Sequence, residues 1–342
     1  MHSHSTATSA ASKAFRASRA SATVAALAAV GLIAAIAPGA AMAEGYPNKP
    51  IRLVIGYTPA GAADFVARVV GEAMSKELGQ PVVVENKPGA GSTLASAWLA
   101  QAPADGYTLG LATATIYGMD QHLYKVKYKA DSFTPITRLT ISPLILAVNK
   151  DLGIADVKTL AAKAKANPGK FNYSSSGIGG SPHVAGLSFA NAVGVDMTHV
   201  PYKGGAPALQ AVAAGEVEFS FGTASSVLPL GTQGVVKMIG VTTPQRSAVA
   251  PGLPTIAELG LPGFDYTFWF GLFGPAGLPK EVTDKLYAVA TKVLADPAIR
   301  TRLVDNGSEP APSRSPAEFK QWAQQDGKNA LQRTVQAGVK ID

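Results

Sequence analysis

The 342-residue sequence contains no cysteine. This absence excludes a disulfide scaffold, a zinc site built on thiolates, a cysteine nucleophile and an iron–sulfur cluster. Charge is also scarce, since 15% of the residues are charged and 47% are apolar, against roughly 25% charged residues in typical soluble domains. Because disordered chains are poor in apolar residues and rich in net charge, we expect a folded chain, long enough for about two domains.

Acidic residues are missing from the first 43 positions, which contain Lys13, Arg16 and Arg19. The apolar run Val24–Ile36 follows, and small residues lead to Ala43. This order predicts a secretory signal peptide over residues 1–43, cleaved after Ala43. As a helix the apolar run would rise only about 20 Å, short of the roughly 30 Å of a bilayer core.

Long apolar runs are absent from the remaining sequence, and without cysteine the chain has no site for a lipid anchor. We therefore expect a soluble mature protein in the periplasm. Its 27 Lys and Arg against 23 acids give a formal net charge of +4. These basic residues are scattered, whereas a nucleic-acid partner requires a clustered basic surface. No nucleic-acid partner is expected, and the mild positive balance suits small anions.

Short β-branched apolar runs alternate with amphipathic stretches along the mature chain. This alternation predicts an α/β fold with mostly parallel sheets. The expected strands are Ile51–Ile55, Pro81–Glu85, Tyr107–Ala112, Leu144–Val148, Phe171–Ser175, Thr198–Tyr202, Val217–Phe221, Val236–Thr242 and Tyr266–Phe273. The expected helices are Phe65–Leu78, Thr93–Ala102, Thr159–Ala166, His183–Val193, Ala208–Ala214, Lys280–Leu294, Ala298–Asn306 and Ser315–Gly338.

Three loops share one construction, in which a strand ends, a glycine-rich turn follows and a helix begins. They are Thr58–Asp64, Lys87–Ser92 and Ser174–Ser181. Such a loop presents backbone N–H groups at the positive end of a helix dipole, and glycine allows the ligand to approach the main chain closely. The loops favour a carboxylate or phosphate ligand, although every α/β fold also needs glycine turns for its connections.

Motifs for cofactors and hydrolysis are absent. Gly177 and Gly179 begin a G-x-G pattern, but Pro182 occupies the position of the third glycine of a dinucleotide fingerprint. The sequence has neither a phosphate-binding P-loop ending nor a G-x-S-x-G elbow. Ser181 and His183 are two residues apart at a helix start, so their side chains diverge. No histidine and acid spacing indicates a metal, and we expect neither cofactor nor metal.

Several segments, in the same order along the chain, resemble those of the Bug-type receptors, which are the substrate-binding proteins of tripartite tricarboxylate transporters. The matching segments are Tyr46–Ile55, Pro59–Asp64, Gly79–Gly91, Ala104–Leu109, Ser176–His183, Val200–Gly204 and Trp269–Gly277. The resemblance covers nearly the whole mature chain in order. It implies a two-lobed periplasmic binding protein of the type II-like class, with each lobe a mostly parallel sheet flanked by helices.

The resemblance also implies a function and a site. A receptor of this kind closes on a small organic carboxylate and delivers it to the membrane components of a tripartite tricarboxylate-type transporter. One loop from each lobe clamps the ligand carboxylate through backbone N–H groups and ordered water. Carried onto this sequence, the ligand-binding residues are Tyr57, Thr58, Ala60, Gly61, Asp64, Asn86, Gly91 and Ser92 in lobe one, and Ser175, Ser176, Gly177, Gly179, Ser181 and His183 in lobe two.

The first loop departs from the family pattern. The usual proline-glycine-glycine run is Pro59-Ala60-Gly61, Tyr57 replaces a common phenylalanine, and Ala63 replaces a common threonine. Tyr57 either contacts the ligand or packs at the strand end, and Asp64 either faces the ligand or caps its helix. If Asp64 faces the ligand, like-charge repulsion disfavours a second carboxylate. That reading predicts a ligand with one clamped carboxylate and a neutral or cationic remainder.

The lobe boundaries are predicted from the breaks in the alternating pattern at Pro143 and Pro262–Gly263. Lobe one would comprise residues 45–145 and 265–342, and lobe two residues 146–264, joined by the strands Thr140–Leu146 and Tyr266–Leu272. We expect a monomeric receptor without enzymatic activity. The alternative is a secreted enzyme or a ligand sensor that uses the same fold, because a fold alone does not determine function.

Overall fold

The computed structural model describes residues 45–336 and 338, so the predicted signal peptide lies outside the described residues. Pro47 begins one compact unit that contains two β-sheets with their helices. Within the described ranges, no helix is both long and apolar enough to cross a bilayer.

The first sheet has the strand order β11-β4-β10-β3-β1-β2. Strand β1, in the middle of the three parallel strands β3-β1-β2, is buried at all positions except Arg52, as expected for a parallel strand covered on both faces. Helix α2 begins after Gly61 and ends at Gly79, whose φ of 67° is the left-handed conformation that glycine adopts readily at a helix end. The strands are β1 (Ile51–Ile55), β2 (Val82–Asn86), β3 (Thr108–Ala112), β4 (Phe133–Ser142), β10 (Phe268–Pro275) and β11 (Glu309–Pro310). The helices are α2 (Ala62–Leu78), α3 (Thr93–Ala100), α4 (Met119–Leu123), α9 (Lys280–Ala295), α10 (Pro297–Asp305) and α11 (Pro316–Gln336), with short 3-10 turns η1 (Ala90–Ser92), η2 (Ala114–Tyr117) and η3 (Ala130–Ser132).

The second sheet has the order β7-β6-β8-β5-β9. Its core is aromatic, because Tyr173, Phe189, Phe219 and Phe221 are fully buried against one another. The strands are β5 (Leu144–Asn149), β6 (Asn172–Ser175), β7 (Thr198–Pro201), β8 (Phe219–Thr223) and β9 (Val236–Val241). The helices are α5 (Val157–Ala166), α6 (Ser181–Val193), α7 (Gly205–Ala214) and α8 (Ala224–Thr232), and the 3-10 turn η4 (Lys150–Leu152) follows β5.

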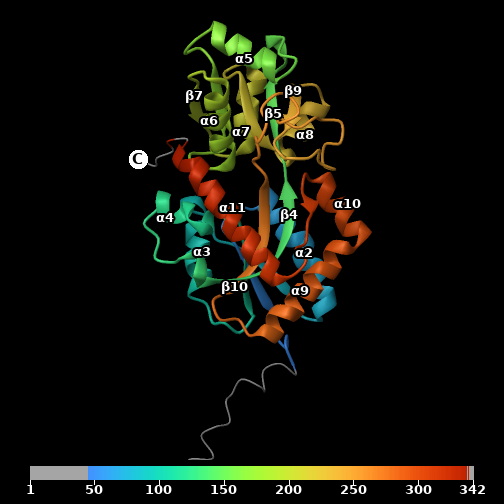
Figure 1. Cartoon of the computed structure of the whole chain (residues 1–342). Coiled ribbons are helices and arrows are strands. Elements are labelled where there is room, and N and C mark those ends of the chain that lie inside the picture. The colour runs from blue at the N-terminus through green and yellow to red at the C-terminus, as the bar shows by residue number, and fades with distance from the viewer. Residues whose placement is uncertain (1–44, 337, 339–342) are drawn as a thin grey trace, which may run out of the picture. The chain divides into compact units, whose positions relative to one another are not determined.

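The expected two-lobed α/β fold is present, with one sheet in each lobe (Figure 1). The sheets are mixed, whereas mostly parallel sheets were expected. Strands β1, β2 and β3 are parallel, and β6 is parallel to β7 and β8, but β10 runs antiparallel to β3 and β4, and β5 runs antiparallel to β8 and β9. The reason is the path of the chain, since β4 leads toward the second lobe and its neighbour β10 returns from it.

The chain passes between the sheets at two adjacent places. Between β4 and β5 lies Pro143, which has no N–H for a sheet ladder. The buried hydroxyl of Thr242 accepts a hydrogen bond from the Leu144 N–H (3.0 Å) and donates one to the Tyr266 carbonyl (2.9 Å). Thr242 therefore ties the outgoing segment to the returning one. The lobe boundaries at residues 145/146 and 264/265 stay a prediction.

Helix α11 joins the lobes on one side. It packs against β4 and η2 of the first lobe and reaches α6 of the second, crossing over the connecting strands (Figure 1). The contact with the first sheet is close at Gly271, where a Cβ atom would lie 2.4 Å from the buried ring of Phe319 and 2.9 Å from that of Phe273. A glycine at this position is therefore a packing requirement.

We expect Gly271→Ala to destabilise the protein by about 1–3 kcal/mol, because the added methyl must displace two buried aromatic rings. Urea unfolding measures this change. Gly252→Ala is the matched control, since nothing lies within 4 Å of its Cβ position, and it should stay within about 0.5 kcal/mol of the parent protein. Equal unfolding free energies for the two variants would contradict the packing argument.

Candidate functional site

The predicted loops follow the central parallel strand of each sheet. Strand β1 lies between β2 and β3, and β6 lies between β7 and β8. The connections therefore leave each central strand in opposite directions, which defines a topological switch point. Ligands of open α/β sheets bind outside the carboxyl ends of strands at such a point. The β1–α2 loop and the β6–α6 loop occupy this position in their own lobes.

The β1–α2 loop is held by the third residue of its helix. Ala60 has a φ of 65°, which is strained for a residue with a Cβ atom, and Gly61 is extended at the helix N-cap. The Ala60 N–H donates a hydrogen bond of 3.0 Å to the carboxylate of Asp64, four residues later. Asp64 therefore stabilises the left-handed turn from inside the loop.

Both carboxylate oxygens of Asp64 have further partners. Oδ2 accepts from Nε of Arg68, and Oδ1 lies 2.9 Å from Nη2 of Arg68 and accepts from Nδ2 of Asn86. Asn86 also donates to the Tyr57 carbonyl, so the ends of β1 and β2 are joined. These donors, led by Arg68, lower the pKa of Asp64 to about 2. Asp64 is 4% exposed, and this geometry assigns it to the support of the loop. Because its charge is paired inside the protein, Asp64 gives no reason to expect a ligand with a neutral or cationic remainder.

The β6–α6 loop repeats this arrangement with different residues. Gly179 has a φ of 77°, Gly180 is extended at the N-cap, and His183 is the third residue of α6. The Gly179 N–H donates to Nδ1 of His183, again four residues later, at 3.1 Å. Ala60, Gly61 and Asp64 of the first lobe thus correspond to Gly179, Gly180 and His183 of the second.

A stack of rings supports the second loop. The His183 and His199 rings are 3.7 Å apart and nearly parallel, and Tyr173 packs beside both. Nε2 of His199 is 2.7 Å from the buried Ser175 hydroxyl, which in turn donates to the Gly177 carbonyl. Burial and the neighbouring His183 lower the pKa of His199 to about 4, and burial lowers the pKa of His183. Both rings are therefore neutral at physiological pH.

The helices behind the two loops lack side-chain caps at their N-termini. Neither Gly61 at α2 nor Gly180 at α6 supplies a capping hydrogen bond. Helices α3, α7, α8 and α9 are also without a side-chain cap, whereas Asp156 caps α5 and Asp296 caps α10. What sets α2 and α6 apart is that each follows a glycine-rich loop at the end of the middle one of three parallel strands. Because the first N–H groups of a helix have no partner within it, α2 and α6 present donors that an anion at the loops could satisfy.

The β2–α3 loop lies against the end of β1. Ala90 and Ser92 have φ values of 44° and 82°, and with Ala60 they are the non-glycine residues of the described chain with positive φ. A Cβ atom on Gly56 would lie 2.0 Å from Oγ of Ser92, so this contact requires glycine. Gly91 faces the Tyr124 ring in the same way. Strained backbone in two adjacent loops is a feature of functional sites.

The Tyr57 side chain lies beside these loops. Its half-buried ring meets the edge of Phe270 at a centroid distance of 6.0 Å. Burial raises the pKa of Tyr57 to about 12, and hydrogen bonds with Thr113 and Ser92 oppose this rise. The nearby carboxyl of Asp120 is buried and accepts a 2.6 Å hydrogen bond from Tyr128, and burial raises its pKa to about 6. Tyr57 therefore packs at the strand end and also carries a hydroxyl toward the loop after β3.

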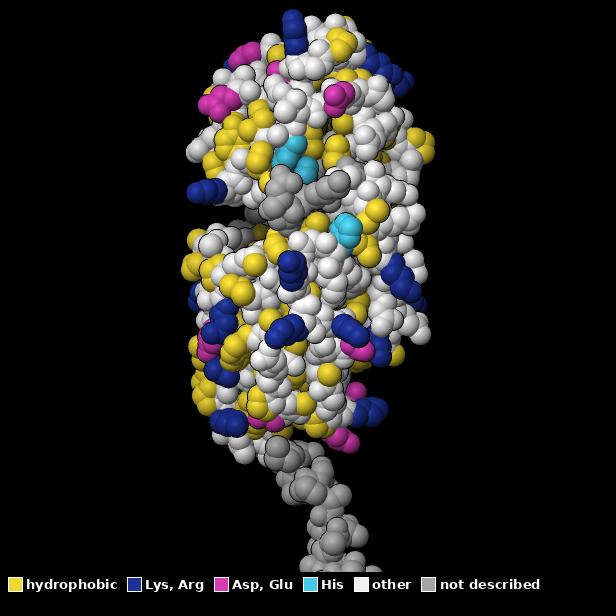
Figure 2. All heavy atoms as spheres, turned by 90° about the vertical axis from the view of Figure 1, so that its left-hand side faces the viewer, with side chains coloured by type: hydrophobic (Ala, Val, Ile, Leu, Met, Phe, Trp, Pro, Cys, Tyr) yellow, Lys and Arg dark blue, Asp and Glu magenta, His cyan; other side chains and the backbone are white. Residues whose placement is uncertain are grey.

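A cavity of about 40 Å³ lies where the two lobes meet. Its walls come from the loop after β3, the start of α6, the beginning of β10 and one face of α11. The lining residues are Thr113, Ala114, Thr115, Met119, Ser181, Val184, Tyr266, Thr267, Phe268, Trp269, Asp326, Ala330, Arg333 and Thr334. The space-filling view shows a notch between the lobes at its left edge (Figure 2).

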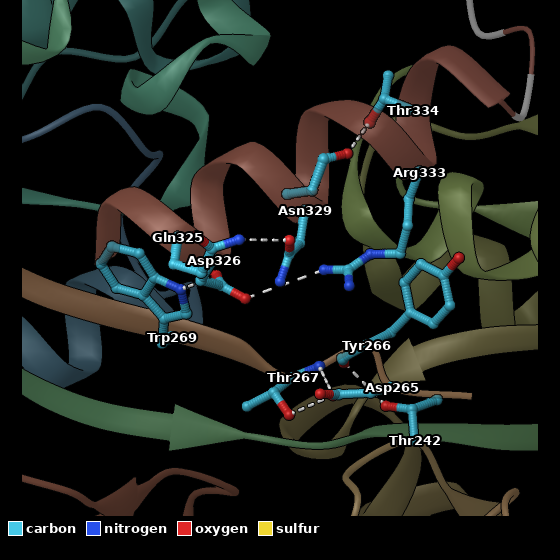
Figure 3. Close-up of polar contacts among 11 residues, drawn as sticks. Thr242, Asp265, Tyr266, Thr267, Trp269, Gln325, Asp326, Asn329, Arg333 and Thr334 are labelled. Carbon is cyan, nitrogen blue, oxygen red and sulfur yellow. Dashed lines mark hydrogen bonds and ion pairs between the residues drawn. The ribbon is translucent and has the colours of Figure 1, made fainter. Parts of the chain in front are cut away.

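The charged residues of the cavity come from α11. Asp326 and Arg333 project toward the segment that leads into β10 (Figure 3). Oδ2 of Asp326 accepts a 2.6 Å hydrogen bond from the Trp269 indole N–H, and Oδ1 is 3.9 Å from Nη2 of Arg333. Burial raises the pKa of Asp326. Sequence analysis did not identify these residues, since no motif connects them to the glycine-rich loops.

The predicted site residues fall into two groups. Asp64, Asn86, Ser175 and His183 direct their polar atoms into the supports of their own loops. The second group has no such supporting role, and its members differ in exposure. Exposed are Thr58, Ala60, Gly91 and Ser176; partly exposed are Tyr57, Gly61, Gly177 and Ser181; buried are Ser92 and Gly179. Of these residues Ser181 lines the cavity. Within residues 45–336 and 338, no group of three or more histidine, aspartate or glutamate side chains could hold a metal ion.

A sequence profile described as the tripartite tricarboxylate transporter family receptor matches residues 66–337. The chain belongs to this receptor family. Its fold is similar to the periplasmic binding protein BugD, with 32% identity and a TM-score of 0.75 over 87% of this chain and 100% of that one. The resemblance to Bug-type receptors is thereby confirmed, and so is the prediction of a solute-binding protein rather than an enzyme.

Two further relatives of this receptor were solved with carboxylates. The R. palustris protein Rpa4515 with adipate is 30% identical, with a TM-score of 0.78 over 86% of this chain and 99% of that one. MatC from Rhodopseudomonas palustris with bound malate is 32% identical, with a TM-score of 0.74 over 84% and 99% of the two chains.

For the first-lobe loop, we expect Asp64→Asn to lower the unfolding free energy at neutral pH by about 1–2 kcal/mol. A carboxyl whose folded pKa is lowered contributes stability that is present above its unfolded pKa and is lost on protonation. The difference between the receptor and the variant should therefore shrink as the pH falls from about 4 to about 2. Urea unfolding across this range measures it.

Glu72→Gln is the matched control, because Glu72 is an exposed carboxylate on the same helix. Exposed ion pairs contribute little, so this variant should unfold like the parent protein. An Asp64→Asn difference that is unchanged at the acidic end would refute the assigned role of the Asp64 charge.

For the second-lobe loop, stability should fall as the pH drops from about 6.5 towards about 4. Between these pH values histidine is protonated in the unfolded chain, whereas His199 stays neutral in the folded protein because its pKa is lowered. Protonation therefore favours unfolding. Removing one ring of the stack by His199→Gln should reduce this pH dependence. Unfolding curves at several pH values measure it, with His122→Gln as the control at an exposed histidine. A variant at position 199 with the parent pH dependence would exclude the stack as its source.

Proposed function

We propose that this receptor binds a small organic carboxylate in the cleft between its lobes. The observation that carries the proposal is the pair of equivalent loops, each of which begins a helix without a side-chain cap. Carboxylate oxygens accept hydrogen bonds from first-turn N–H groups, and the helix dipole favours the negative charge. The adipate and malate bound to relatives support the same ligand class.

The family supports a role in uptake. The bound carboxylate would be delivered to the membrane components of a tripartite tricarboxylate-type transporter. BugD is a periplasmic binding protein, and the periplasm is the expected compartment here as well. Residues 1–43 serve in this proposal as a cleaved signal peptide, consistent with their basic start and apolar run. The monomeric state stays a prediction.

Ligand capture would involve closure of the lobes, with residues 45–145 and 265–342 moving against residues 146–264. Hinges of such proteins are a few residues at the ends of elements. Pro143 interrupts the outgoing connection, and the Thr242 hydroxyl joins Leu144 of that connection to Tyr266 of the returning one. This bridge keeps the two connections together, so we infer that they bend as one unit.

The ligand class is tested by a thermal-shift screen of organic acids against their methyl esters. Free acids should raise the melting temperature and the esters should not, because an ester lacks the charge that the helix N-termini stabilise. An ester that binds as tightly as its acid would disprove the clamp. Failure of every acid in a broad screen would disprove the proposed function.

The loops are tested with Gly61→Val and Gly180→Val. At both positions an added Cβ would make only ordinary contacts, at 3.6 Å or beyond, so we expect folded variants. The new side chains should obstruct approach to the helix N-termini and weaken the best carboxylate at least about tenfold. Ser176→Ala, in the exposed part of the second-lobe loop, is the comparison and should weaken binding less than either valine variant, because the proposed contacts are made by main-chain N–H groups. Full affinity in both valine variants would move the ligand away from these loops.

A further inference from the structure

The cavity between the lobes contains a cation with spare hydrogen-bonding capacity. An arginine side chain has five N–H donors, and the nearest carboxylate oxygen that the described residues place near Arg333 is 3.9 Å away, on Asp326. Charge-assisted hydrogen bonds are about 2.7–2.9 Å long, so this pair is loose. The other face of the guanidinium lies 5.1 Å from the Tyr266 ring centre.

The hydroxyl and carboxylate groups near Arg333 are already committed. Asp326 accepts the indole N–H of Trp269, Thr334 donates to the Ala330 carbonyl, and Thr267 donates to Asp265 (Figure 3). The side chain of Arg333 is 27% exposed. It is therefore partly desolvated, and a carboxylate that reached the cavity would find in it a partner able to bind through two parallel hydrogen bonds.

The size of the cavity indicates what it can hold. A water molecule needs roughly 10–15 Å³ of such volume, so about 40 Å³ accommodates about three waters or a single carboxylate group. A whole organic acid does not fit. A ligand must therefore place only one end in the cavity.

The second-lobe clamping loop adjoins the cavity, and the first-lobe loops lie on strands next to its wall. Ser181, the first residue of α6, lines it directly. On the other side the cavity is lined by Thr113, which directly follows β3, the strand paired with β1. A ligand held by one carboxylate at the N-termini of α2 and α6 would thus extend its other end toward α11.

We propose that Arg333 binds the second carboxylate of a dicarboxylate ligand, and that it selects dicarboxylates over monocarboxylates. The inference rests on the proposed function, because the first carboxylate is held by the loops. Asp64 does not oppose this ligand, since its charge is paired with Arg68 at 2.9 Å. The selected class differs from the ligand with a neutral or cationic remainder that the sequence alone favoured.

The test compares straight-chain dicarboxylates from succinate to suberate with monocarboxylates of the same chain length, by isothermal titration. The parent protein should bind its best dicarboxylate at least about tenfold more tightly than the matched monocarboxylate, the scale of one charged hydrogen bond. Arg333→Gln should remove this preference and leave monocarboxylate affinity unchanged, which also shows that the variant is folded. Lys328→Gln removes the same charge from an exposed position of α11 and should retain the preference.

The outcomes separate the two proposals. If dicarboxylates bind but Arg333→Gln keeps the preference, or if monocarboxylates bind the parent protein equally well, the role of Arg333 is overturned and the carboxylate receptor stands. If Lys328→Gln loses the preference as fully as Arg333→Gln, the effect is one of general charge and the cavity assignment is overturned. If no carboxylate of either series or of the broader screen binds, the receptor proposal itself fails.

Discussion

The hydrogen bond from the Ala60 N–H to the Asp64 carboxylate holds a turn that the chain would otherwise avoid. A left-handed backbone costs a residue with a Cβ roughly 1–2 kcal/mol, and Ala60 adopts it at 65°. The buried carboxylate offsets this cost and is itself kept charged by Arg68 and Asn86. The position of the α2 N-terminus, and with it the first-lobe half of the cleft, depends on this contact.

In the second lobe, the left-handed turn is held by a neutral hydrogen-bond acceptor. Nδ1 of His183 takes the place of the Asp64 carboxylate, and Gly179 takes the place of Ala60. Glycine removes the strain of the turn, so the weaker acceptor suffices. The two supports also respond to different pH ranges, because a carboxylate with a lowered pKa is lost only in strong acid, whereas an imidazole that must accept a hydrogen bond is lost on protonation.

Local sequence signals located the loops but not the groups that support them. Strand runs such as Ile51–Ile55 and the glycines after them are contiguous patterns, so their elements could be predicted closely. The pairing of His183 with His199, and of Asp326 with the cavity, joins segments brought together only by folding. Helix α8 was missed because Pro229 lies inside it, and proline normally interrupts a helix. One local signal does accompany both loops, namely a side-chain acceptor four residues after the left-handed residue: Asp64 after Ala60 and His183 after Gly179.

The two loops are rigid, whereas the connections between the lobes can bend, and both properties matter for the proposed capture of the ligand. A ligand shifts a conformational equilibrium only by the difference in its affinity for the two states. Because each loop is internally braced, neither can shift alone to replace the hydrogen-bond donors of the other. In the proposed mode of binding, a carboxylate would gain the full set of hydrogen bonds only when the two helix N-termini approach it together. In this proposal the free energy for closure comes from hydrogen bonds between the ligand and the uncapped first-turn N–H groups. Because the loops are rigid, the movement takes place in the two connections, at Pro143 and at the segment before β10 that Thr242 bonds to Leu144.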